Sequence, residues 1–150
     1  MREIKFKVWD KSEKHWIEES AVNLSCDGQI YFSDGYNLNM LNTNDLILLQ
    51  YTGLKDKNGK EIYEGDIVKG KFIRYLPEKK IFKIISAVIF EHGMFRIKCR
   101  YSKWSKKFYY DSFPYSHGKG EYLKIIGNIF ENPELQEGGK WDYIKYCVQI

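Results

Sequence analysis

Cysteine, proline and long apolar runs are all scarce in this sequence of 150 residues. The three cysteines, Cys26, Cys99 and Cys147, are odd in number and form no C-x-x-C pair, which predicts small buried thiols in a reducing compartment, not disulfides or a zinc site. No apolar run approaches the roughly 18 residues of a membrane span. The first residues alternate charge with hydrophobe, unlike a signal peptide. We therefore expect a cytoplasmic protein with no membrane partner.

Motifs of catalytic chemistry are also missing. The three histidines stand alone beside turn residues, without the His-x-x-x-His spacing of a metal-ligand pair. No G-x-S-x-G, G-x-x-x-x-G-K or G-x-G-x-x-G segment occurs. The acidic cluster Glu61, Glu64 and Asp66 could hold a cation, but Asp and Gly are the residues that tight turns require, so a turn is preferred. We expect no enzymatic activity, no metal and no cofactor.

Aromatic residues are abundant, at 17%, and only three prolines interrupt the chain. Tyr and Phe among Ile and Val favour strands, and this much apolar material excludes disorder. Alternating patterns predict a hairpin from strands 3–9 and 15–17, and further strands at 29–32, 94–101 and 122–130. Residues 81–90 are apolar on both faces, which predicts a central strand covered on both sides. Asn58-Gly59 and His92-Gly93 are predicted turns, 76–80 is a predicted loop, and Gly127 marks a bend or a close backbone approach.

These elements predict a mainly β fold. The expected architecture is a small, partly open β-barrel with a smaller N-terminal β lobe and a short C-terminal tail. The corresponding ranges are 1–60 for the lobe, 61–135 for the barrel and 136–150 for the tail, which is either a short helix or an added edge strand.

Charge is unevenly distributed. The whole chain carries +4, but residues 69–107 hold twelve basic residues against two acids, a net +10, and the remainder carries −6. Such asymmetry indicates a basic surface for a polyanion or protein partner, or a molecule that associates head to tail.

Three segments together resemble one protein family. They are REIKFKVWD at 2–10, QYTGLKDKNGKEIYEGDIV at 50–68 and GNIFENPEL at 127–135. The chain thereby resembles the YopX family of phage and prophage proteins. The resemblance implies a mainly β fold and an origin in a phage or prophage of a bacterial host cell; it carries over no reaction and no catalytic residue. Residues 69–119 and the segment after Leu135 depart from the family pattern.

The basic segment contains a candidate binding surface. Cations lie on one predicted strand face, about 6.6–7 Å apart, and aromatic residues follow them, which together suit the backbone and the bases of a single-stranded nucleic acid. The surface consists of Arg96, Lys98, Arg100, Tyr101, Lys103, Trp104, Lys106, Lys107, Tyr109 and Tyr110. The alternative is that Lys and Arg only protect an exposed strand edge from aggregation.

A binding role without catalysis is therefore expected. The favoured partners are a host or phage protein, or a second copy of the chain in a homo-oligomer, because Tyr, Trp and Arg are enriched at interface hot spots. The aromatic residues could instead complete the barrel core, as expected for Phe95, Phe108 and Phe113. Single-stranded or non-specific nucleic acid is the alternative partner.

Overall fold

A computed structural model describes residues 3–18, 22–26, 29–33, 38–40, 45–76, 78–100, 108–112, 123–132 and 135. It describes the backbone alone at 32–33, 38–40, 71–76, 78–84, 98–100 and 108–112. The twelve regular elements within the described residues are all β-strands, which confirms the mainly β class. The predicted tail, 136–150, lies outside the described residues, and the predicted division at residue 60 stays a prediction.

The N-terminal part contains a four-stranded sheet in the order β2-β1-β6-β7. Its strands are β1 (Phe6–Asp10), β2 (His15–Ile17), β6 (Leu46–Lys55) and β7 (Glu61–Tyr63). The predicted opening hairpin is confirmed, with Trp9 directly opposite Trp16 and the two rings in edge contact at 4.9 Å. Trp9 also stacks on Phe130, which joins this sheet to the residues after β12.

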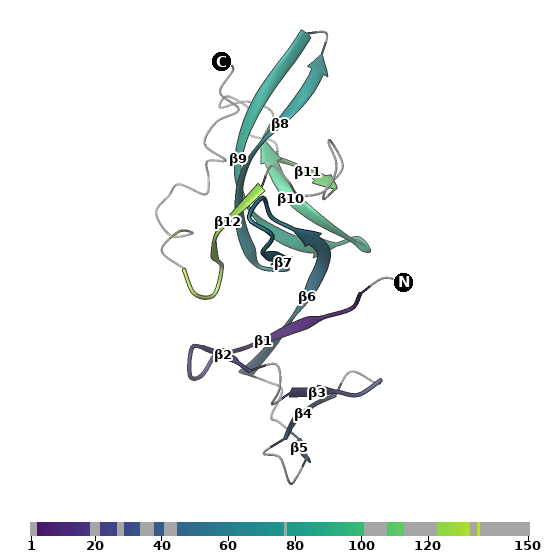
Figure 1. Ribbon diagram of the computed structural model, residues 1–150, viewed down its shortest axis with the longest axis vertical. Coiled ribbons are helices and arrows are strands. Elements are labelled where there is room, and N and C mark those ends of the chain that lie inside the picture. The colour runs from purple at the N-terminus through teal and green to yellow at the C-terminus, as the bar shows by residue number, and fades with distance from the viewer. Residues whose placement is uncertain are drawn as a thin grey trace.

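A small three-stranded sheet lies below these strands in Figure 1. It consists of β3 (Val22–Leu24), β4 (Ile30–Ser33) and β5 (Leu38–Met40), so the predicted strand at 29–32 is confirmed. Cys26 follows β3 and is exposed, so the prediction of a buried thiol is wrong there: a turn residue has no packed neighbour on its outer side.

The barrel part is a five-stranded sheet in the order β11-β10-β9-β8-β12. Its strands are β8 (Asp66–Leu76), β9 (Glu78–Glu91), β10 (Met94–Arg100), β11 (Phe108–Ser112) and β12 (Leu123–Asn128). The strand predicted at 81–90 is central, as expected. His92 and Gly93 both have positive φ, as a two-residue type I′ hairpin requires.

The β8–β9 hairpin is longer than the sequence pattern predicts. The register continues through Arg74↔Lys80, Tyr75↔Lys79 and Leu76↔Glu78, so the prediction of a loop at 76–80 is wrong. Continued backbone pairing outweighs the low strand preference of the charged residues. Figure 1 shows this hairpin extending beyond the other strands.

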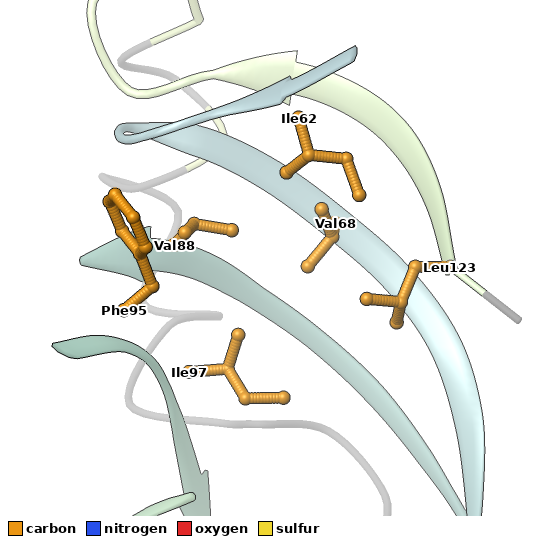
Figure 2. Close-up of a cluster of buried hydrophobic side chains, with 6 residues drawn as sticks. All are labelled: Ile62, Val68, Val88, Phe95, Ile97 and Leu123. Carbon is orange, nitrogen blue, oxygen red and sulfur yellow. The ribbon is translucent and has the colours of Figure 1, made fainter. Parts of the chain in front are cut away.

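The curled sheet encloses a compact apolar core, as a partly open barrel does. Figure 2 shows the buried side chains that fill it, drawn from β7, β8, β9, β10 and β12. They are Ile62, Val68, Val88, Phe95, Ile97 and Leu123. Phe95 is therefore a core residue, as predicted. Only the backbone of Phe108 is described, in register with Arg100, so its core assignment stays a prediction. Phe113 lies outside the described residues.

The turn between β7 and β8 ties the end of β12 to the barrel. Gly65 has a φ of 79°, and its N–H donates to the Val88 carbonyl while its own carbonyl accepts from Ile129 N–H. Asp66 accepts from Tyr63 N–H at 2.8 Å and from the side-chain amide of the buried Asn128 at 3.1 Å. The predicted tight turn is thus confirmed.

Gly127 permits a close approach, as predicted. A Cβ at this position would stand 2.5 Å from the Asn132 side-chain oxygen. That oxygen accepts the Asn128 N–H at 3.1 Å, so the chain turns back on itself directly after β12.

Asp56 organises the turn between β6 and β7. The predicted hairpin forms, but only Gly59, not Asn58, has positive φ. The buried Asp56 carboxylate accepts backbone N–H groups of Asn58 and Lys60, and a third from Ile125 on β12. Burial by itself would raise the pKa of Asp56, but these three donors outweigh it and lower the pKa below its ordinary value.

Replacing Asp56 should therefore destabilise the fold in a pH-dependent way. Asp56→Ala leaves three backbone donors without their acceptor, and we expect the free energy of unfolding at pH 7 to fall by about 2–4 kcal/mol. Because the pKa of Asp56 is lower in the folded than in the unfolded state, its ionised carboxylate stabilises the fold at pH values above the unfolded-state pKa. This stabilisation is lost as the pH falls through the folded-state pKa. Urea unfolding at several pH values should show the difference from wild type shrinking below about pH 4. Asp45→Ala, at an exposed carboxylate, is the control; an equal effect of both variants contradicts the account.

Candidate nucleic-acid interface

The cations of β10 lie on the side of the sheet away from the core. Phe95 and Ile97 are buried, which confirms the predicted alternation. Arg96, which lies between them in the strand, pairs with Ile89 on β9. Lys98 and Arg100 follow at the same two-residue spacing. The Arg96 Nε is buried and has no hydrogen-bond partner within the described part of the chain.

Strand β11 adds aromatic residues to this face. Lys98 lies directly opposite Tyr110, and Arg100 opposite Phe108. Tyr109 pairs with Cys99, at the alternate position of the backbone register. Of the surface predicted from sequence, the strands thus bring four members to one face: Arg96, Lys98, Arg100 and Tyr110. The remaining members, Tyr101, Lys103, Trp104, Lys106 and Lys107, lie outside the described residues.

Neighbouring strands supply further cations that the sequence pattern does not reveal. Lys69 lies opposite Lys124, Lys71 opposite Lys83, and Lys79 opposite Tyr75. The register from β8 to β11 has no shift, so all of these positions share the side occupied by Arg96. We call this set the cationic face: Lys69, Lys71, Lys79, Lys83, Arg96, Lys98, Arg100 and Lys124.

The cationic face places like charges directly opposite each other. Lys69 and Lys124 are both exposed and form one such pair, whereas Lys71 and Lys83 are described only by their backbone register. Facing like charges destabilise an antiparallel pair of strands. This face is therefore electrostatically unfavourable in isolation, and a bound polyanion would relieve the repulsion.

A cleft of about 650 Å³ adjoins the cationic face at Lys124. Its walls come from the two sheets and the turn between β6 and β7, and include Lys7 on β1, Trp16 on β2 and Lys60. The Lys7 Nζ lies 4.4 Å from the centre of the Tyr63 ring and 6.0 Å from that of Trp16.

The two carboxylates that line this cleft are already engaged. Glu131 accepts from the Trp16 indole N–H, and Asp66 accepts from Tyr63 and Asn128. Burial raises the pKa of Asp66 above its ordinary value, although these donors act in the opposite direction.

Glu61, another member of the acidic cluster predicted from the sequence, forms structural contacts. Glu61 accepts from Lys5 at 2.6 Å and from the Tyr63 hydroxyl at 2.9 Å. The Lys5 ammonium lowers the pKa of Glu61. Within the described residues, no group of three His, Cys, Asp or Glu side chains is arranged to hold a metal ion.

The fold and the site define a class: a mainly β protein whose partly open barrel carries a cationic face. The chain belongs to the YopX family, because the family model described as YopX protein matches residues 5–137. The SPbeta prophage-derived uncharacterized protein YopX of Bacillus subtilis (strain 168) is 28% identical over 145 residues, which cover 90% of this chain and 97% of that protein.

A solved structure supports the fold. The crystal structure of protein EF1440 from Enterococcus faecalis matches 91% of this chain and 100% of its own, with a TM-score of 0.53 and 24% identity. At this identity the likeness shows the fold alone. Within the described residues, no helix is long and apolar enough to cross a bilayer.

Reversing one charge in a facing pair should stabilise the sheet. Lys69→Glu places a carboxylate opposite Lys124, and we expect the free energy of unfolding at low salt to rise by about 0.2–1 kcal/mol. The gain should shrink at high salt because both side chains are exposed. Lys57→Glu, in an exposed turn, makes the same charge change as a control. An equal rise in both variants would show that net charge, not the facing pair, is responsible.

Proposed function

We propose that this protein acts by binding, without catalysis, and that the cationic face binds single-stranded nucleic acid. The supporting observation is the register that gathers cations from β8, β9, β10 and β12 on one side of the sheet. Protection of a strand edge does not account for all of them. Lys69 pairs with both β9 and β12, and Arg96 with both β9 and β11, so both are at interior positions.

The face has the two components that a single-strand binder needs. Cations two residues apart along β10 are spaced by about 6.6–7 Å, close to the spacing of phosphates on a strand. Tyr110 and Phe108 lie opposite Lys98 and Arg100, so aromatic residues alternate with cations across the two strands. Bases stack on such residues with little sequence preference.

Salt dependence tests this proposal. Fluorescence anisotropy with a labelled oligothymidylate should give an affinity that falls steeply with salt, with a slope of about −0.7 per phosphate neutralised. The double variant Arg96→Ala/Lys98→Ala should weaken binding and make the slope shallower by about 1.4.

A matched variant controls for net charge. Lys14→Asn/Lys57→Ala also removes two cations, from exposed turns, and Asn tolerates the positive φ at residue 14. We expect its affinity to change far less than that of the β10 variant. Equal losses in both variants contradict the assignment of the surface, and an absence of binding at low salt contradicts the function.

Association with a protein partner is the second candidate function. An apolar hollow of about 160 Å³ lies between β1, β2, β3 and β6, and Ile4 and Leu24 on its rim are 64% and 40% exposed. Exposed apolar residues around a hollow are typical of protein contacts. A second copy of the chain fits the uneven charge, because the basic segment 69–107 of one copy can contact the acidic remainder of another. A host or phage protein could instead occupy the apolar hollow.

Sedimentation measures the self-association directly. We expect a concentration-dependent dimer at low salt, and the variant Ile4→Ser/Leu24→Ser should shift it toward monomer because it removes exposed apolar contact. A strict monomer at both low and high salt contradicts self-association. A phage or prophage origin and a cytoplasmic location in the bacterial host complete the proposal.

A further inference from the structure

The cleft beside the cationic face concentrates positive charge from distant parts of the chain. Lys7 comes from β1, Lys60 from the turn before β7 and Lys124 from β12. No ion pair joins any of these three ammonium groups to a carboxylate of the described residues. The carboxylates in the cleft accept hydrogen bonds from other donors: the Trp16 indole, the Asn128 amide and the Tyr63 N–H. Lys7 and Lys60 act on Asp66 only through longer-range charge attraction, which lowers the pKa of that carboxyl against the effect of burial. The three ammonium groups can therefore bind an anion that enters the cleft.

The cleft also has apolar surface. Trp16 and Ile125 are half-buried in its wall, and Ile126 is 38% exposed beside them. Ile126 owes its position to the irregularity in β12, where the register shifts between Ile125 and Gly127. An extra residue in a strand redirects its side chain, and such irregularities are frequent next to functional sites.

Size and chemistry together define the ligand class. A volume of about 650 Å³ lies within the range of small-molecule sites, roughly 300–1,000 Å³, and exceeds the need of an inorganic ion. Three lysine ammonium groups suit a phosphate, which carries close to two negative charges and three acceptor oxygens. An aromatic ring and an isoleucine suit the flat, weakly polar face of a base.

We propose that this cleft binds a nucleoside phosphate, with Lys7, Lys60 and Lys124 around the phosphate and Trp16 and Ile126 beside the base. The ligand is either a free nucleotide or the phosphorylated end of a nucleic acid strand. Lys124 belongs to both the cleft and the cationic face, so a strand on that face can end in the cleft. The cleft site does not require the face to bind a polyanion.

Calorimetric titration of the full chain tests the site. The four ribonucleoside 5′-monophosphates are titrated separately at low salt, each beside its nucleoside. At least one monophosphate should bind with a dissociation constant of about 1 mM or lower, and its nucleoside about tenfold more weakly or worse. The variant Lys60→Ala/Lys124→Ala should weaken this binding about tenfold or more. Both lysines are exposed and Lys124 faces Lys69, so the variant should have a thermal unfolding midpoint no lower than that of wild type.

The control variant is Lys14→Asn/Lys57→Ala, which has the same net charge but leaves the cleft unchanged and should bind as wild type does. Oligothymidylates with a 5′-phosphate or a 5′-hydroxyl distinguish the two ligand sources. If the strand end is the ligand, the phosphorylated form binds about tenfold tighter and Lys60→Ala removes only that difference.

Two results would overturn the cleft site. One is that no monophosphate binds near 1 mM and the 5′-phosphate gives no advantage. The other is that both double variants lose affinity equally. Loss of oligonucleotide binding with intact monophosphate binding would overturn the proposed function but leave the cleft site standing, so the two proposals fail separately.

Discussion

The unbroken antiparallel register of β8, β9, β10 and β11 determines both the core and the cationic face. Directly paired residues lie on the same side of a sheet, so one set of backbone hydrogen bonds determines which positions of the four strands share a side. Val68, Val88, Phe95 and Ile97 are thereby directed to the core. Burial of these apolar groups fixes the register, because a slip of one residue would send cations into the core. The cationic face is a consequence of the core.

The turn at residues 64–66 links the barrel sheet to the residues that line the cleft. Gly65 is hydrogen-bonded to both Val88 and Ile129, and Asp66 holds the Asn128 amide. Asp56 adds a second connection, from the β6–β7 turn to Ile125. The barrel, the N-terminal sheet and β12 are therefore held together by buried polar contacts, which cost stability when only partly satisfied. This arrangement brings Lys7, Lys60 and Lys124 to one cleft although 117 positions separate the first from the last.

Local pattern was enough to predict part of the fold and of the candidate site. Alternation along residues 94–101 predicts both the buried Phe95 and the outward Arg96 and Lys98, and the His92-Gly93 turn is visible as a dipeptide. Pairing between distant strands leaves no such local signal. Lys69 and Lys124 face each other only because β12 pairs with β8. Because residues 76–80 were predicted to form a loop, the sequence did not predict that Arg74 pairs with Lys80. The cleft likewise depends on contacts between segments that no spacing connects.

Chemical acetylation of individual lysines, with and without a bound oligothymidylate, shows whether the cationic face binds a nucleic acid strand. The reagent reports each lysine by mass spectrometry, and the β8–β9 hairpin contains its own control, since Lys80 lies on the opposite side of the sheet from Lys83. We expect the oligonucleotide to protect Lys69, Lys71, Lys83 and Lys98 together and to leave Lys80 and Lys57 reactive. Equal protection of Lys80 and Lys83, or no protection of Lys69 and Lys98, would contradict this expectation.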